Sequence, residues 1–109
     1  MMELNLTIRK ARIDDTETIT SFNIAMAKET EGKDLEYNTI HNGVKNLFMH
    51  PEYGFYIVAE DNGKNIGCLM VTYEWSDWRN GLFWWIQSVY IHPDYRRKGI
   101  YRTMYSFVK

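Results

Sequence analysis

A basic turn at residues 96–102, with the sequence Arg-Arg-Lys-Gly-Ile-Tyr-Arg, is the segment best suited to binding an anion. It follows an apolar stretch that ends at Ile91, and apolar residues at helical spacing begin again at Ile100. The start of a helix presents unpaired N–H groups and a partial positive charge, so it binds phosphate groups readily. Gly99 has no Cβ and lets an anion approach the backbone closely. The sequence therefore predicts an anion site at a strand-to-helix turn.

The distribution of charge favours the same region. Residues 90–109 carry a net charge of +4, and because the whole chain carries −1, the first 89 residues carry −5. An acidic remainder favours a cationic substrate. The basic turn has two other interpretations: a solvated helix start, or a nucleic-acid contact in which nearby tyrosines stack on bases. The acidic overall balance and the lack of a second basic strip argue against nucleic acid.

Other reactive residue types have less informative positions. The three histidines and one cysteine do not have metal-ligand spacing, so no metal site is predicted. His41 is expected at an exposed helix position, while His50 and His92 each precede a proline and are expected in loops. Cys68 is predicted to be a small core residue rather than a nucleophile.

Aromatic side chains gather between residues 73 and 85. Most are expected in the core, because large rings dominate burial in small domains. Some are candidates to line an acceptor pocket, where a ring face holds a cationic amine. Trp78, in a polar connection, is the best pocket or interface candidate. The members of this group are Tyr73, Trp75, Trp78, Trp84 and Trp85.

The N-terminal half of the chain shows the pattern of one strand and two helices. Alternating apolar residues predict a strand over residues 4–11. Asp14, with Glu17 three residues later, predicts a capping box at the start of a helix over residues 15–28. Apolar residues from position 40 to 48 predict a second helix, which His50-Pro51 ends.

The C-terminal half predicts three strands and a helix. Residues 55–60 and 66–75 are β-rich and flank a hairpin turn at residues 61–64. After a polar connection, residues 82–91 are almost continuously apolar, which is typical of a strand covered on both faces. Helical spacing returns from Ile100 to Val108. The predicted order is β-α-α-β-β-β-α, a mixed α/β (α+β) fold.

Length and composition fit one domain over residues 1–109. Apolar residues make up 45% of the chain and charged residues 25%, which suits a packed core with an ordinary water-facing surface. No apolar run approaches the roughly 18 residues that span a membrane. The first residues lack a secretory-signal pattern, and the single cysteine cannot form an internal disulfide. Together these features predict a cytoplasmic protein without membrane contact.

The turn and the order of elements resemble the GNAT superfamily of acetyl-CoA-dependent N-acetyltransferases. The family's motif A, Arg/Gln-x-x-Gly-x-Gly/Ala, lies between a strand and a helix, and Arg96, Gly99 and the strand that ends at Ile91 match it. Tyr101 departs from the motif, because it stands where Gly or Ala is usual. Its ring either crowds the phosphate or points away and packs beneath the helix, and the second arrangement is expected.

The resemblance implies acetyl-CoA as cosubstrate and a set of residues that bind it. Val89, Tyr90 and Ile91 would offer backbone groups to the pantetheine arm and the acetyl carbonyl. The turn would surround the pyrophosphate with Arg96, Arg97, Lys98, Gly99, Ile100, Tyr101 and Arg102.

The resemblance also implies acetyl transfer to a primary amine, small or peptidic, by direct attack. The family often places a catalytic Glu on the fourth strand, where this chain has no carboxylate and offers Gln87. Gln87 cannot act as a base but could orient the amine or a water. Glu74, on the preceding strand, is the nearest carboxylate. Both are weak candidates, and the catalytic residues stay open.

The end of the sequence leaves two interpretations. A strand followed by a helix normally returns to a parallel neighbouring strand, and none follows Val108, so the family's C-terminal strands and helix are missing. Either the chain is a truncated form or a partner completes the sheet. An exposed sheet edge then predicts self-association, such as a homodimer. The alternative to an enzyme is an inactive CoA-binding or remnant domain that acts through self-association.

Overall fold

A computed structural model describes residues 4–109 of the chain, and residues 1–3 lie outside the described part. The elements in chain order are β1 (Leu6–Lys10), the 3-10 turn η1 (Ile13–Asp15), α1 (Thr16–Glu31), α2 (Tyr37–Met49), β2 (Gly54–Asp61), β3 (Lys64–Ser76), β4 (Gly81–Ile91), the 3-10 turn η2 (Pro93–Tyr95) and α3 (Ile100–Val108). The predicted order of strands and helices and the mixed fold class are confirmed.

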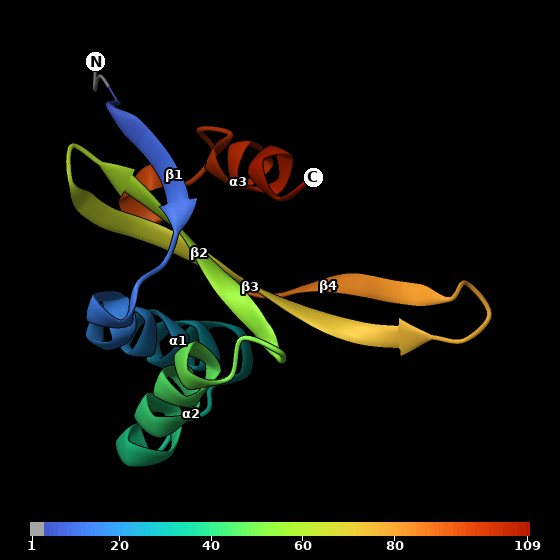
Figure 1. Ribbon diagram of the computed structural model, residues 1–109. Helices are drawn as coiled ribbons and strands as arrows, with labels where there is room; N and C mark the ends of the chain where they lie inside the picture. The colour runs from blue at the N-terminus through green and yellow to red at the C-terminus, as the bar shows by residue number, and fades with distance from the viewer. Residues whose placement is uncertain (1–3) are drawn as a thin grey trace.

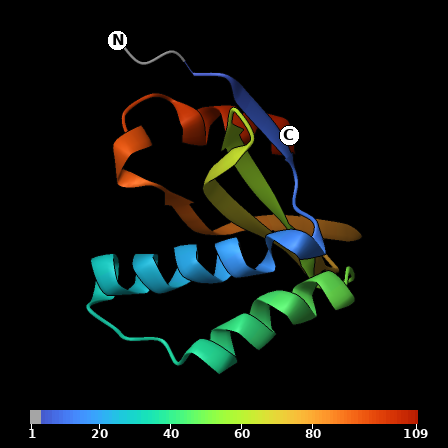
Figure 2. The ribbon, with the colours of Figure 1, turned by 90° about the vertical axis from the view of Figure 1, so that its left-hand side faces the viewer.

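The four strands form one antiparallel sheet in the order β1-β2-β3-β4. The helices α1 and α2 cover one face of this sheet and α3 covers the other (Figures 1 and 2). Each face has its own buried cluster: Val58 and Cys68 point toward α1 and α2, whereas Ile57 and Leu69 point toward α3. None of the described helices is long and apolar enough to cross a membrane.

The start of α1 differs from the predicted capping box. Asp14 is exposed and makes no cap; Asp15 is the N-cap residue, and its carboxylate accepts a hydrogen bond of 2.7 Å from the Arg12 N–H. Glu17 instead contacts α2, where it accepts from the hydroxyl of Tyr37 at 2.6 Å and lies 2.9 Å from His41 Nε2. The predicted capping box at Asp14 and Glu17 is therefore wrong. The N-cap position belongs to Asp15, and the Glu17 carboxylate binds side chains of α2 instead of the start of its own helix. The helix also ends later than residue 28, at Glu31.

A polar cluster fastens the start of α1 to the sheet. The Arg9 guanidinium binds both carboxylate oxygens of Asp15 at 2.9 and 3.0 Å, and it binds Glu60 at 2.8 Å. Asn65 donates to Asp15 at 3.1 Å. Burial by itself would raise the pKa of Asp15, but these hydrogen bonds outweigh it and lower the pKa to about 2. The cluster thus joins β1, β2 and β3 to the helix that crosses one face of the sheet.

The predicted hairpin between β2 and β3 is confirmed. Asn62 and Gly63 have φ angles of +53° and +85°, as a two-residue hairpin turn with both central residues at positive φ requires. Beyond a one-residue register shift between Ala59 and Glu60, Val58 lies opposite Cys68. This register places alternate side chains of both strands in the two buried clusters.

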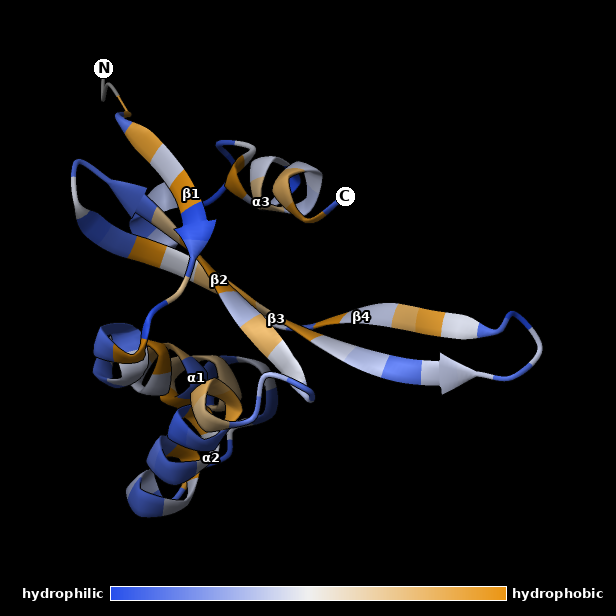
Figure 3. Cartoon of the chain, in the orientation of Figure 1, coloured by the Kyte–Doolittle hydropathy of each residue, from blue (hydrophilic) through white to orange (hydrophobic). Residues whose placement is uncertain are grey.

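The expectation that residues 82–91 form a strand covered on both faces is wrong for their first half. The outer parts of β3 and β4 extend beyond the helices as a two-stranded arm (Figure 1). Trp75, Leu82, Trp84 and Trp85 are each more than half exposed there. Figure 3 colours most of the arm pale, the middle of the hydropathy scale, with orange, hydrophobic residues on part of β4. No described helix packs over this part of the sheet, and the apolar composition of the strand alone could not show this.

Candidate functional site

The connection between β4 and α3 has a well-defined backbone. The turn η2 begins at His92, whose ring nitrogen Nδ1 accepts from the Asp94 N–H at 3.2 Å, and the Tyr95 N–H donates to the His92 carbonyl at 2.8 Å. Beyond it, Arg97 and Gly99 adopt φ angles of +64° and +75°. Two left-handed residues bend the chain sharply, so α3 begins directly beside the end of β4.

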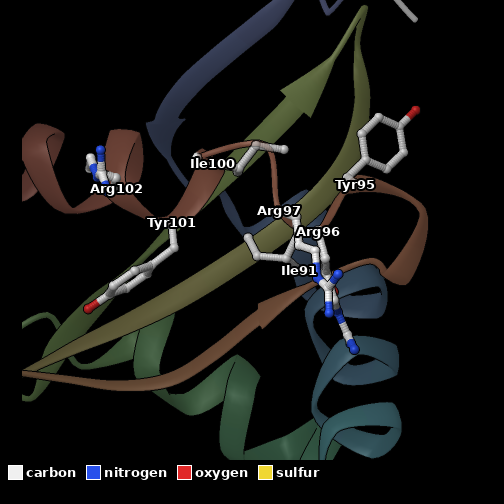
Figure 4. A pocket seen from close by; sticks show the side chains of 8 residues that line it. Ile91, Tyr95, Arg96, Arg97, Ile100, Tyr101 and Arg102 are labelled. Atoms are coloured by element: carbon white, nitrogen blue, oxygen red, sulfur yellow. The ribbon is translucent and has the colours of Figure 1, made fainter.

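The first turn of α3 presents free backbone N–H groups. The Thr103 N–H donates to the Gly99 carbonyl at 3.1 Å, which is the first hydrogen bond of the helix. The N–H groups of the three residues before it have no acceptor within the helix. The same three residues line a hollow of about 280 Å³, which we call the helix hollow (Figure 4). It is lined by Ile91, Tyr95, Arg96, Arg97, Gly99, Ile100, Tyr101 and Arg102.

A second hollow, of about 200 Å³, continues along β4 toward the sheet. We call it the strand hollow; its walls come from α1 and from the last residues of β4. It shares Ile91 and Arg96 with the helix hollow. Its lining residues are Met26, Glu29, Thr30, Val89, Tyr90, Ile91 and Arg96. The two hollows follow one another from the last residues of β4 to the start of α3, and together we call them the groove.

A β-bulge lies at the inner end of this groove. Cys68 pairs with Tyr90 and Met70 with Gln87, so two residues of β4 stand opposite one residue of β3. Ser88, with φ of +53°, is one of these two. A bulge leaves an extra residue unpaired and bends its strand, and bulges often re-aim a strand beside a functional site.

The four basic side chains of the turn have different surroundings. The Arg96 guanidinium is bound by Glu29 at 2.6 and 2.8 Å, and its Nε–H donates to the Ile91 carbonyl at 2.8 Å. By contrast, Arg97, Lys98 and Arg102 form no ion pair with any side chain of residues 4–109. Three cations are therefore available to a ligand at the start of α3, and the fourth is already neutralised.

The structure thus gathers the residues predicted to bind the cofactor. All of them except Lys98 line the helix hollow or the strand hollow. The side chain of Tyr90, however, is only 7% exposed and packs on Phe22 with ring centroids 5.1 Å apart. Tyr90 can therefore serve a ligand mainly through its backbone.

Tyr101 points away from the centre of the helix hollow, as expected, but it does not pack beneath the helix. Its ring is 43% exposed and lies 6.2 Å from the ring of Tyr105, one turn later. Figure 4 shows the rings of Tyr95 and Tyr101 on opposite sides of the hollow. The ring of Tyr101 therefore extends toward Tyr105 along α3, and the N–H of Tyr101 has no acceptor within the helix.

The two weak catalytic candidates lie on one face of the β3–β4 arm. Gln87 pairs with Met70 and Glu74 with Phe83, which places both on the face that carries α1 and α2. Gln87 adjoins the bulge and donates to the hydroxyl of Thr72 at 2.6 Å. The Glu74 carboxylate accepts from Trp85 Nε1 at 2.6 Å. Glu74 also lines a hollow of about 400 Å³ near the end of the arm, with Asp77 and several aromatic residues.

Other candidate residues do not form a reactive site. Cys68 is buried, and burial raises the pKa of its thiol to about 12, so it carries no thiolate at neutral pH. Trp78 is 95% exposed in the turn of the arm and lies outside the hollow that its neighbours line. Residues 4–109 contain no group of three or more His, Cys, Asp or Glu side chains arranged to hold a metal ion.

The sequence did not reveal the residues that α1 contributes to the groove. Met26, Glu29 and Thr30 line the strand hollow. Glu29 reaches Arg96 across 67 positions of sequence, and no periodicity signals a contact of that range. The predicted helix also stopped at residue 28, one position before Glu29.

Comparison with known proteins identifies the family. Residues 15–109 match the model of the acetyltransferase (GNAT) family. Among solved structures, a possible acetyltransferase from Clostridium difficile 630 is 49% identical and superposes with a TM-score of 0.90, over 97% of this chain and 69% of that one. No curated protein matches the chain significantly.

More distant structures share the fold. An integron cassette protein from the mobile metagenome of Cole Harbour Salt Marsh is 21% identical with a TM-score of 0.87, over 93% of this chain and 66% of that one. A predicted acetyltransferase of Clostridium acetobutylicum, solved with acetyl-CoA, is 19% identical with a TM-score of 0.78, over 94% of this chain and 70% of that one. This chain therefore spans about two thirds of each of these proteins. The family match and the 49% identical structure show that the chain belongs to the GNAT family of acetyltransferases, which use acetyl-CoA.

Proposed function

We propose that this chain binds acetyl-CoA in the groove along β4 and transfers the acetyl group to a primary amine. The observation that carries the proposal is the start of α3. There, Arg97 and Arg102 line the helix hollow beside N–H groups that have no acceptor within the helix, and Lys98 lies in the same turn; none of these three cations forms an ion pair within residues 4–109. Oriented N–H groups, a helix dipole and nearby cations are what a pyrophosphate requires.

The remaining parts of the cofactor have a natural placement. The backbone of residues 97–102 would surround the pyrophosphate. Val89, Tyr90 and Ile91 line the groove between the bulge and the helix hollow, and their backbone groups would serve the pantetheine arm. Within residues 4–109, β4 pairs only with β3, so its other edge keeps backbone donors and acceptors for a ligand.

The reaction needs no covalent enzyme intermediate. The amine nitrogen attacks the thioester carbonyl carbon, a C–N bond forms and the C–S bond breaks. The amine loses a proton and the CoA thiolate gains one. A backbone N–H near the bulge, from the segment of Val89 to Ile91, would polarise the carbonyl oxygen as negative charge develops there.

The acceptor would approach from the arm. Gln87 adjoins the bulge and would orient the amine or a water through its amide, which cannot accept the proton. Glu74 lies further out on the same face, where its carboxylate would attract a cationic amine. The aromatic rings beside it offer cation–π contacts. These positions favour a positively charged acceptor over an acidic one.

The same exposed arm supports self-association. An unpaired strand edge flanked by exposed tryptophans is a template for pairing with another chain. We propose that two copies pair through the outer part of β4, on the arm, which leaves the edge at Val89 to Ile91 to the ligand. This assembly and acetyl transfer can therefore be tested separately.

Calorimetry with acetyl-CoA and an assay of CoA thiol release with a panel of amines test the proposed activity. In the Gly99→Ala variant, a Cβ at a φ of +75° costs about 1 kcal/mol of backbone strain and shifts the helix start. We expect acetyl-CoA affinity to fall several-fold.

Gly63→Ala is the matched control. Gly63 also has a positive φ, +85°, and no heavy atom lies within 4 Å of the position of an added Cβ at either glycine. We expect Gly63→Ala to lose similar stability and to keep acetyl-CoA affinity. If the chain binds acetyl-CoA but releases no CoA with any amine, it is an inactive CoA-binding domain rather than an enzyme. No binding at all would contradict both.

A further inference from the structure

Within residues 4–109, Arg96 is the one basic residue of the turn whose side chain forms an ion pair with another side chain. Both of its terminal nitrogens bind the Glu29 carboxylate, at 2.6 and 2.8 Å, in a bidentate pair. Its Nε–H donates to the Ile91 carbonyl at 2.8 Å, and its guanidinium carbon lies 5.5 Å from the centre of the Tyr90 ring. The planar guanidinium therefore joins α1, the end of β4 and the turn.

This contact lies beside the most strained part of the turn. Arg97, directly after Arg96, has a φ of +64°, a left-handed conformation that costs a residue with a side chain about 1–2 kcal/mol. Gly99 adopts a similar conformation two residues later. Such a backbone persists only where its surroundings hold it. The contacts of Arg96 with Glu29 and Ile91 fix the first residue of this segment.

The pair also lies where the two hollows meet. Arg96 lines both of them, and Glu29 lines the strand hollow. The guanidinium holds the pKa of Glu29 below its ordinary value, so this carboxylate is charged at neutral pH. A charged carboxylate in this position opposes direct contact between Arg96 and a phosphate.

We propose that Arg96 is a positioning residue: held by Glu29, it shapes the turn before acetyl-CoA arrives, and the phosphates bind the backbone of the turn with Arg97, Lys98 and Arg102. This inference rests on the proposed function. It assigns a role to Glu29, which lies on a helix far from the turn in sequence. The competing view is that Arg96 leaves Glu29 and binds phosphate directly.

The two views make opposite predictions for Glu29→Gln. If the pair positions the turn, its loss leaves fewer molecules in the binding-competent shape. A competent fraction reduced to one fifth raises the apparent Kd for acetyl-CoA about fivefold. If Arg96 binds phosphate, Glu29→Gln releases the guanidinium and acetyl-CoA binds more tightly. Titration of the full chain with acetyl-CoA in a calorimeter distinguishes them.

Arg96→Lys tests the same pair from its other partner, and the double variant with Glu29→Gln separates the two views. Lysine keeps the charge but cannot form the bidentate pair with Glu29 or the Nε–H bond to Ile91. A positioning role therefore predicts about the same fivefold loss of acetyl-CoA affinity as for Glu29→Gln. The double variant would then bind no more weakly than either single variant, because both changes remove one interaction. With any amine that supports turnover, KM for acetyl-CoA would rise while kcat stays constant.

Glu31→Gln is the matched control, because it removes the same charge from the same helix. Glu31 pairs only loosely with Lys33, at 3.8 Å, and does not line the groove. We expect its acetyl-CoA affinity to equal that of the unmodified chain. Unchanged or tighter binding by Glu29→Gln, or an equal loss in Glu31→Gln, would overturn the positioning role. Failure of the unmodified chain to bind acetyl-CoA would instead overturn the proposed function.

Discussion

Neighbouring residues of one type have different roles in the turn between β4 and α3. Arg96 is bound by Glu29, whereas Arg97 forms no ion pair within residues 4–109 and adopts a positive φ. Tyr95 donates its hydroxyl proton to Asp61 at 2.9 Å, whereas Tyr101 extends along α3. A residue's role at this site is therefore set by where its side chain is directed. The departure of Tyr101 from the family motif illustrates the point, since the backbone N–H remains available.

At this scale we predict that Tyr101→Ala changes acetyl-CoA affinity by less than about twofold. The variant removes a ring that points away from the hollow and leaves the backbone N–H in place. Alanine also has a higher helix propensity than tyrosine. Calorimetric titration with acetyl-CoA measures the effect.

Tyr105→Ala is its comparison, because it removes the ring that packs on Tyr101 from a residue outside the helix hollow. We expect both variants to behave alike. A tenfold loss in Tyr101→Ala alone would mean that the ring contacts the cofactor.

At the scale of the elements, α1 connects the sheet to the groove. Its first turn is fastened to β1, β2 and β3 through the cluster of Arg9, Asp15, Glu60 and Asn65. Its last turn carries Glu29, which binds Arg96. The helix thus spans from a polar anchor at one side of the sheet to the ligand groove at the other. Its orientation on the sheet decides whether Glu29 can reach the turn.

We predict that Asp15→Asn destabilises the protein in a pH-dependent way. The pKa of Asp15 in the folded state, about 2, lies below its unfolded value near 3.8. A carboxylate of this kind contributes stability that is present above the unfolded pKa and lost as the pH falls through the folded one. We expect the variant to be less stable by about 2 kcal/mol at pH 7, because hydrogen bonds to charged groups are lost. The difference should shrink steadily between pH 4 and pH 2.

Urea unfolding of both proteins across this pH range measures the difference. Asp14→Asn is the control, because Asp14 is exposed one residue earlier. It should change the free energy of unfolding by less than about 0.5 kcal/mol. A stability difference for Asp15→Asn that does not vary with pH would show that the carboxylate charge is not responsible.

At the scale of the whole molecule, the β3–β4 arm is the least covered part. It extends from the body in Figure 1, while the helices pack near the other strands. The core is therefore concentrated on β1, β2 and the inner halves of β3 and β4, where Ile57, Val58 and Leu69 are fully buried. The arm carries large exposed rings on both of its faces, and it is the surface on which self-association is proposed.

We predict that Leu82→Lys reduces self-association through β4. Leu82 is 57% exposed on the arm, so lysine fits there and adds charge that opposes pairing of strand edges. Sedimentation equilibrium over a range of concentrations measures the change.

Trp78→Lys is the control for this variant. It adds the same charge in the turn of the arm, beyond the paired residues of β4, and should leave association unchanged. A chain that remains monomeric at high concentration without any substitution would contradict the assembly.

The sequence alone was sufficient for the elements and their order, and it predicts the anion site, because each depends on local patterns. Alternation marks strands, helical spacing marks helices, and the turn with Gly99 lies between Ile91 and Ile100 whatever the rest of the chain does. The tertiary structure decided which carboxylates cap a helix and which bridge two elements, where β4 is uncovered, and which arginine of the turn is bound by a carboxylate. Asp15 binds Arg9, and Glu29 binds Arg96 across 67 positions, through contacts that follow from how α1 crosses the sheet. Such contacts depend on the packing of distant segments, and no local pattern of residues encodes them.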